Sequence, residues 1–209
     1  LGTLFDGAVH PGWTWAFARA EPIVFANVAT AARAGGGGEG APGDGRDAVS
    51  LATDVNAQFD PDLSWDDVDW FRSLWDGPII VKGIQCVADA VLAAERGVDA
   101  VALSNHGGRQ LDSAPAPIEL VAPVVDAVGG RTEVICDGGV RRGSDIVKAV
   151  ALGASACMAG RAYLYGLGAA GERGVDHVLS MLDADVRRTM ALLGAPSVAD
   201  LTPELVTSR

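Results

Sequence analysis

The sequence predicts an α/β fold in which parallel strands alternate with helices, and two observations support this. First, strand-length apolar runs are each followed by a stretch with helical spacing; these pairs span residues 78–96, 100–128, 133–152 and 156–193. Second, the runs are apolar throughout, which is typical of strands that are buried on both faces of a parallel sheet. Such a series makes either half of an eight-stranded βα barrel or part of a doubly wound sheet.

The positions of the polar residues favour the barrel. Each apolar run turns polar or rich in glycine at its carboxyl end, as at Lys82, Ser104, Asp137 and Gly160. Barrel enzymes gather their active sites on this face, and they often bind phosphate with the loops after the last two strands. The sequence therefore predicts a (βα)8 TIM barrel, of which this chain supplies about half.

The loop after the second run predicts a site for a small acid. It reads Ser-Asn-His-Gly-Gly-Arg-Gln-Leu-Asp over residues 104–112. His106 is suited to proton transfer near neutral pH, and Arg109 offers a planar fork of donors that matches a carboxylate. Gly107 and Gly108 allow a tight turn between them. The alternative is that His106 and Arg109 only cap the loop.

The loops after the third and fourth runs combine glycine with arginine, which suits a phosphate dianion. The residues concerned are Asp137, Gly138, Gly139, Arg141, Gly160 and Arg161. Lys82 ends the first run, where an unpaired buried charge would cost several kcal/mol, so we expect it to face an anion. The alternative for Lys82 is an ion pair with a neighbouring carboxylate such as Asp137.

Two helices and a loop are expected before the first strand. His10 precedes a proline and is expected to start a short helix with an aromatic face. Ser64 is a good N-cap for an amphipathic helix whose tryptophans we expect to anchor the core. Between them, residues 31–58 contain a run very rich in glycine and are expected to form a mobile loop.

Composition limits the classes of protein to consider. The 209 residues are 49% hydrophobic and 21% charged, as in an ordinary globular domain. The chain has 16 Lys and Arg and 27 Asp and Glu, which gives a net charge of −11. An acidic chain repels the phosphate backbone, so nucleic acid is not expected as a partner. Cys86, Cys136 and Cys157 are predicted to be reduced core residues, with no disulfide and no metal site. No apolar run is long enough to span a bilayer, which predicts a soluble, cytoplasmic protein.

Together these residues resemble the family of FMN-dependent 2-hydroxy acid dehydrogenases and oxidases. Residues 104–112 match the signature of that family at every position. Residues 59–61, 75–78 and 160–165 are most similar to its bacterial, quinone-linked L-lactate dehydrogenases. The resemblance implies FMN as cofactor and a single partial domain over residues 1–209, which supplies strands 5–8 of the barrel and a long lid loop.

The resemblance also implies roles for the candidate residues. His106 would be the base that takes a proton from the substrate, and Arg109 would hold the substrate carboxylate. Lys82 would lie beside the N1/O2 edge of the flavin, and Ser104 would also contact the flavin region. The ribityl and phosphate end would be lined by Asp137, Gly138, Gly139, Arg141, Gly160 and Arg161.

The expected reaction is oxidation of a small L-2-hydroxy acid, with L-lactate preferred, to the 2-keto acid. Quinone, oxygen and a cytochrome are all acceptors within the family, so the electron acceptor stays open. The resemblance further implies a homo-oligomer for the full-length parent. The cytoplasm is the expected location, and peripheral attachment to the inner face of the cell membrane stays open.

Two other functions compete with this expectation. The first is another phosphate-binding TIM-barrel flavoenzyme, or a barrel of the inosine-monophosphate dehydrogenase kind. The second is a non-catalytic or inactive half-barrel, because the chain starts at Leu1 and lacks the earlier strands of the family.

Overall fold

The computed structural model describes residues 9–19, 60 and 62–207. The predicted mobile loop at residues 31–58 lies outside this part of the chain, as do Phe59 and Pro61. Contacts divide the chain into two compact units, residues 1–62 and 63–209, which are described separately.

In the first unit the described residues form helix α2 (Pro11–Arg19). The prediction for His10 is confirmed, because its carbonyl accepts a hydrogen bond from Thr14 N at 3.0 Å and the helix begins at the following proline. The Arg19 guanidinium lies 4.4 Å from the centroid of the Trp15 ring, which makes a cation–π contact.

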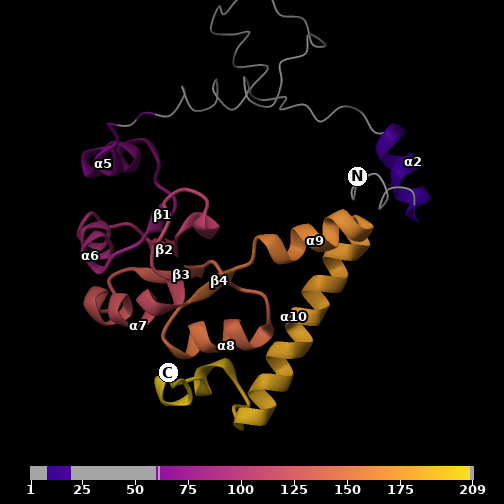
Figure 1. Cartoon of the computed structure of the whole chain (residues 1–209). Helices are drawn as coiled ribbons and strands as arrows, with labels where there is room; N and C mark the ends of the chain where they lie inside the picture. Colours follow the sequence, from indigo (N-terminus) through magenta and orange to yellow (C-terminus); the bar gives the residue numbers. More distant parts are fainter. Residues whose placement is uncertain (1–8, 20–59, 61, 208–209) are drawn as a thin grey trace, which may run out of the picture. The chain divides into compact units, whose positions relative to one another are not determined.

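The second unit is built on a four-stranded parallel sheet with the order β1-β2-β3-β4 (Figure 1). The strands are β1 (Ile80–Ile84), β2 (Ala100–Ser104), β3 (Glu133–Asp137) and β4 (Ala156–Met158). Because spatial order follows chain order without reversal, the sheet has the arrangement of consecutive βα units in a barrel. A doubly wound sheet would reverse its order at a switch point.

Helices follow each strand as predicted. The helices of this unit are α5 (Trp65–Leu74), α6 (Val87–Glu95), α7 (Pro117–Val128), α8 (Gly143–Ala151), α9 (Arg161–Ala170) and α10 (Glu172–Leu193). Three short 3-10 turns complete it: η1 (His106–Gly108), η2 (Val198–Asp200) and η3 (Pro203–Leu205).

The hydrophobic core lies between the sheet and one layer of helices (Figure 1). Alternate residues of the central strands, such as Leu103 and Cys136, pack against buried side chains of α6, α7 and α8, among them Ala93, Val121 and Ala149. The residues between them point to the opposite face of the sheet, because successive side chains in a strand alternate. On that face Ile80 is 54% exposed and Met158 is 43% exposed. The sheet is therefore a partial α/β barrel with its helices outside.

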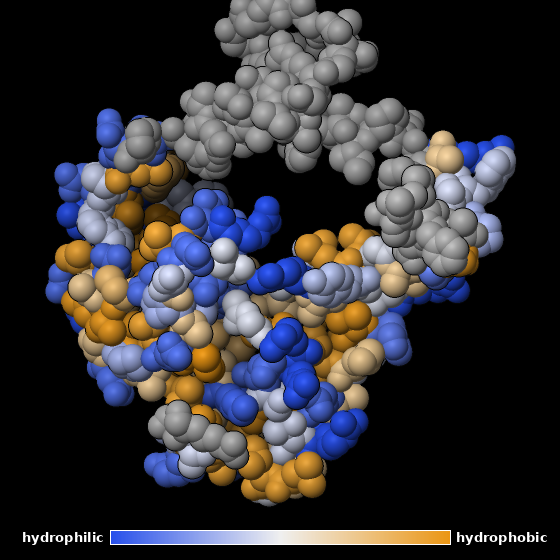
Figure 2. Space-filling model, viewed as in Figure 1, coloured by the Kyte–Doolittle hydropathy of each residue, from blue (hydrophilic) through white to orange (hydrophobic). Residues whose placement is uncertain are grey.

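The predicted tail helix is broken into α9 and α10 at Gly171, which has φ 60°. The two helices pack closely where Gly166 meets Gly174, and a Cβ at either position would overlap the backbone of the other. Figure 2 shows apolar side chains on the visible surface over α9 and at the end of α10, where Leu164, Leu167, Leu192 and Leu193 are exposed.

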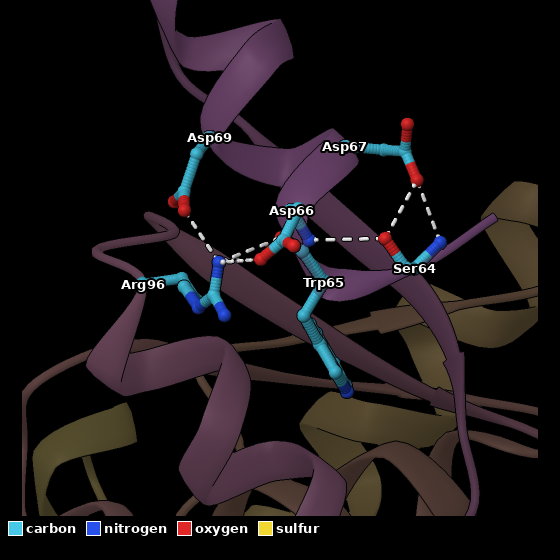
Figure 3. A network of polar contacts seen from close by, with 6 residues as sticks. All are labelled: Ser64, Trp65, Asp66, Asp67, Asp69 and Arg96. Carbon is cyan, nitrogen blue, oxygen red and sulfur yellow. Dashed lines mark hydrogen bonds and ion pairs between the residues drawn. The ribbon is translucent and has the colours of Figure 1, made fainter.

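The prediction for the tryptophan helix is partly wrong. Ser64 caps α5 as expected, since it forms a capping box with Asp67 (Figure 3). Trp65 packs partly against the core, but Trp70 and Trp75 are 55% and 58% exposed. At 3.6 residues per turn, Trp70 lies about 140° around the helix from Trp65, so the two cannot face the core together. Trp75 follows the last residue of α5.

Helix α5 is joined to the end of α6 by charged residues. The Arg96 guanidinium donates to Asp66 Oδ1 at 3.1 Å, to the Trp65 carbonyl at 3.1 Å and to Asp69 (Figure 3). These carboxylates raise the pKa of Arg96, with the hydrogen bond to Asp66 as the main cause. The network ties the helix before β1 to the first βα unit.

The cysteine prediction holds for two of the three residues. Cys136 is buried and Cys157 is half-buried; burial raises the pKa of these thiols to about 12 and about 11, so both stay protonated. Cys86 is exposed instead, and its sulfur caps α6 by accepting from Asp89 N. All three are free thiols.

Candidate active site

Three predicted residues meet near the carboxyl edge of the sheet: Ser104 ends β2, Asp137 ends β3, and Lys82 is the middle residue of β1. Lys82 Nζ lies 2.8 Å from Asp137 Oδ2 and donates to Ser104 Oγ at 3.1 Å. The Ser104 hydroxyl donates in turn to Asp137 Oδ2 at 2.7 Å. The parallel register explains the meeting, because Ser104 stands opposite Asp137 on the neighbouring strand. The ion pair considered for Lys82 is therefore present.

A β-bulge in β1 lies directly after Lys82. The register between β1 and β2 shifts between Lys82 and Ile84, and the extra residue, Gly83, has φ 98°. Such bulges bend a strand and redirect a side chain. The Lys82 side chain stays 42% exposed, and its contacts with Asp137 and Ser104 use two of the three ammonium hydrogens. Lys82 therefore has a donor left for an anion.

The Asp137 carboxyl has a pKa below its ordinary value. Its burial alone raises the pKa, but the hydrogen bonds from Lys82 and Ser104 together with the charge of Lys82 outweigh this effect, and His106 adds a smaller attraction. Asp137 is therefore ionised near neutral pH and holds the ammonium group of Lys82 in place.

The loop that follows β2 turns tightly, as the two glycines predict. His106, Gly107 and Gly108 have φ values of 56°, 69° and 72°, all in the left-handed region. Asn105 holds this turn by accepting from Gly107 N at 3.0 Å through its side chain, and from Gly108 N at 3.0 Å through its carbonyl. His106 and Arg109 are both exposed, so one short loop offers a proton acceptor and a carboxylate binder to a ligand.

The loop also contacts the start of α9. Arg161 Nη2 donates to the Gly107 carbonyl at 3.0 Å. A Cβ at Gly107 would lie 2.9 Å from the same Nη2, so a larger residue there would require the end of the Arg161 side chain to shift. The proposed phosphate-binding arginine is thus joined to the loop that carries His106.

A cavity of about 400 Å³ lies beside this contact. Gly138, Gly139 and Arg161 line it, together with Asn105 and Lys148. Of the predicted phosphate residues, Asp137, Arg141 and Gly160 do not line it. Arg141 is exposed, and its backbone N donates to Asp145 Oδ2 at 3.0 Å. The sequence analysis did not predict Lys148 as a site residue. The one feature that could have indicated it is its position in the second turn of the helix that follows the glycine loop.

Within the described ranges, no group of three His, Cys, Asp or Glu side chains is placed to hold a metal ion. None of the helices described here is long and apolar enough to cross a membrane.

Comparison with known proteins decides the family. The model of the family described as FMN-dependent dehydrogenase matches residues 1–208. The chain belongs to this FMN-dependent dehydrogenase family. The predicted cofactor and the resemblance to 2-hydroxy acid dehydrogenases and oxidases are thereby confirmed at the level of the family.

Individual relatives differ in the substrate that they are named for. A putative L-lactate dehydrogenase of Mycobacterium tuberculosis is 42% identical over 99% of this chain and 46% of its own length. A peroxisomal (S)-2-hydroxyacid oxidase of Arabidopsis thaliana is 52% identical over 69% of this chain and 40% of its own. The crystal structure of a monotopic membrane protein, (S)-mandelate dehydrogenase, superposes with a TM-score of 0.82 at 40% identity, covering 99% of this chain and 52% of that one. The chain thus spans about half the length of the relatives it matches.

The residues of this member of the FMN-dependent dehydrogenase family fit a phosphate-bearing, electron-accepting cofactor. Although the whole chain is strongly acidic, Lys82, Lys148 and Arg161 bring cations to the carboxyl ends of its strands. A Cβ at Gly139 or at Gly160 would meet no atom within 4 Å, so there is open space beside both glycines. The roles of the individual residues toward FMN stay predictions.

Proposed function

We propose that this chain carries the catalytic residues of an enzyme that oxidises a small L-2-hydroxy acid, specifically L-lactate, to the 2-keto acid with FMN. The observation that carries the proposal is the exposed loop after β2, where His106 and Arg109 lie three residues apart beside the Lys82–Ser104–Asp137 network. The family and the name of the mycobacterial relative support the choice of reaction and substrate.

Substrate binding would rest on Arg109. Its guanidinium has five donors in a planar fork, so it can grip both oxygens of a carboxylate at once. An acid bound there would bring its 2-hydroxyl close to His106, because only Gly107 and Gly108 separate the two residues. The tight left-handed turn shortens the path between them further.

Proton transfer would be the task of His106. Oxidation of a 2-hydroxy acid to a 2-keto acid removes two electrons and two protons, and His106 would accept the hydroxyl proton. When bound, FMN supplies the electron-accepting chemistry. Lys82 would stand at the electron-accepting ring, where a cation favours added negative charge. The ribityl and phosphate end would be held by residues of the loops after β3 and β4: Asp137, Gly138, Gly139, Arg141, Gly160 and Arg161. Of these, Gly138, Gly139 and Arg161 line the cavity.

The native protein tests this proposal directly. We expect it to be yellow and to lose its flavin absorbance in the absence of oxygen when L-lactate is added. L-mandelate and glycolate should reduce it more slowly, and D-lactate should not reduce it. His106→Ala should slow the reduction by at least about 100-fold, in line with the loss of a general base. A colourless protein, or a His106→Ala variant that is reduced at the normal rate, would contradict the proposal.

Turnover also needs an electron acceptor, for which we propose quinone, oxygen or a cytochrome. Oxygen consumption, quinone reduction and cytochrome c reduction during lactate oxidation separate the three. We further propose that the full-length protein is a homo-oligomer, in the cytoplasm or attached peripherally to the inner face of the membrane. The relative described as a monotopic membrane protein supports the peripheral attachment. Sedimentation and membrane fractionation of the native protein test these two points.

A further inference from the structure

The start of helix α8 is held by a carboxylate from another helix. Asp185 belongs to α10 and lies 42 residues along the chain from Gly143, the first residue of α8. Its Oδ2 atom accepts from Gly143 N at 2.8 Å and from Ser144 N at 3.4 Å. These are two of the four backbone N–H groups that a helix leaves without an intrahelical partner at its start. Asp185 therefore caps α8 from a distant part of the sequence.

Close packing holds the two helices together at the same point (Figure 1). Gly143 is buried, and a Cβ at this position would overlap the backbone of α10 at Val186. The Asp185 side chain is 31% exposed, and its Oδ1 atom lies 3.4 Å from Arg188 Nη1. The start of α8 is thus fixed against α10 by contact between backbones as well as by hydrogen bonds.

A second carboxylate holds the residues just before α8. Asp145 Oδ2 accepts from Arg141 N at 3.0 Å and from Arg142 N at 2.9 Å. Four consecutive N–H groups, from residue 141 to residue 144, therefore donate to only two carboxylates. Negative charge is favourable at this position because of the helix dipole.

The loop between β3 and α8 is thereby anchored at both of its ends. At its start, Asp137 is held by the network with Lys82. At its end, Asp185 holds the first turn of α8. Between these anchors Gly138 and Gly139 have φ values of 132° and 76°. Glycine has the widest choice of backbone conformations, so such a loop keeps one shape only where its ends are fixed.

We propose that Asp185 is a positioning residue for cofactor binding. Its carboxylate fixes the end of the loop at residues 138–142, which thereby presents its two glycines and Arg141 to the phosphate end of FMN. This inference rests on the proposed function, in which this loop holds that end of the cofactor. Asp185 acts on the loop through the backbone of α8.

Flavin titration of the native protein, after removal of its flavin, tests this role. For Asp185→Ala we expect the dissociation constant of FMN to rise about tenfold, because a loop that has the right shape in only about a tenth of the molecules lowers the affinity by that factor. Riboflavin lacks the phosphate that the loop would hold, so its dissociation constant should rise less than about twofold. Equal losses for the two flavins, or an Asp185→Ala variant that binds FMN normally, would overturn the inference.

Two further variants separate positioning from a general loss of stability. Asp183→Ala is the matched control, because Asp183 lies on the same helix and forms an exposed ion pair with Arg187 at 2.8 Å. It should leave the dissociation constant of FMN within about twofold, as expected for an exposed pair. Asp185→Asn keeps one acceptor oxygen for Gly143 N, so we expect a smaller rise of about threefold. This variant replaces Asp185→Ala in every experiment if the alanine variant fails to fold.

A second measurement needs neither flavin nor turnover. Hydrogen exchange in the flavin-free protein, followed by mass spectrometry of overlapping peptides, reports on the amides of residues 141 and 142. These amides donate to Asp145 and not to Asp185, so faster exchange there shows that the whole end of the loop has loosened. We expect Asp185→Ala to speed this exchange at least about tenfold and Asp183→Ala to leave it unchanged. Unchanged exchange in Asp185→Ala would overturn the inference.

The two measurements also separate this inference from the proposed function. A native protein that binds no flavin and does not oxidise lactate would refute the proposed function. The exchange experiment would still decide whether Asp185 orders the loop.

Discussion

At the scale of single residues, the site depends on charged groups that are held by partners from other strands. Asp137 is an example. Burial raises the pKa of its carboxyl, but the stronger effect of Lys82 and Ser104 lowers it. Loss of Lys82 would therefore raise the pKa of the Asp137 carboxyl. The pH dependence of protein stability therefore tests the Lys82–Asp137 pair.

We expect Lys82→Met to destabilise the protein less and less as the pH falls. The folded-state pKa of Asp137 is lowered, so its stabilising effect is fully present above the ordinary pKa of about 3.9 and is lost as the pH falls through the lowered value. In the Lys82→Met variant, Lys82 no longer counteracts the effect of burial, so the pKa of Asp137 rises. Melting temperatures of both proteins between pH 7 and about pH 3 provide the measurement. A difference in melting temperature that stays constant over this range would contradict the expectation.

Gly107 and Gly108 offer a matched pair of substitutions. Both have φ near 70°, so replacing either by alanine should cost about 1 kcal/mol through backbone strain. Only at Gly107 does the new Cβ also meet Arg161, whereas at Gly108 it meets no atom within 4 Å. We therefore expect Gly107→Ala to be the more destabilising in urea unfolding, and to weaken FMN binding by displacing Arg161. Equal effects of the two substitutions would show that the Arg161 contact contributes nothing.

At the scale of elements, close packing of two helices explains a pattern of small residues that sequence periodicity does not reveal. The backbones of α9 and α10 approach each other at Gly166 and Gly174, which lie on opposite sides of the break at Gly171. Arg161 is the first residue of α9, so the placement of this helix also places the arginine that contacts the loop with His106.

Substitutions along α9 and α10 test this packing. Gly174→Ala should destabilise the protein by about 2 kcal/mol or more, since the added methyl overlaps the backbone of α9. Gly168→Ala is the control, because its Cβ would meet nothing and alanine favours a helix by about 0.5 to 1 kcal/mol. Urea unfolding measures both. A neutral Gly174→Ala would mean that the two helices move apart at little cost.

At the scale of the whole molecule, the second unit has one covered face and one open face. Apolar side chains such as Ile80 and Met158 lie on the open face, and they belong to the first and last strands of the described sheet. Exposed apolar faces and strand edges favour association. The chain also spans only about half the length of its relatives.

We therefore expect the 209-residue chain, expressed by itself, to self-associate. Sedimentation should show species larger than a monomer at micromolar concentration, and Ile80→Asp should shift the distribution toward monomer. Leu192→Asp is the control, because Leu192 is 83% exposed on α10 and is not part of the sheet. A monodisperse monomer for the unsubstituted chain would contradict this expectation.

The order of the four strands, the helix after each of them and the loop of the candidate site could be predicted from the sequence alone. The break between α9 and α10 could not. Apolar periodicity and capping residues act within a few positions, so they predicted the four strands, their helices and the loop with His106 and Arg109. The sequence also predicted that the candidate site lies at the carboxyl ends of the strands, because parallel strands place all of these ends at one edge of the sheet.

The tertiary structure alone decided which side chains meet and which faces are covered. The bonds of Ser104 to Lys82 and Asp137 join residues that are 22 and 33 positions apart, and they depend on strand register and on the bulge at Gly83. The exposure of Trp70, Trp75 and Cys86 was likewise known only from the structure, because it depends on which other elements pack against these side chains. Such contacts arise between distant parts of the chain, and local sequence patterns carry no information about their register.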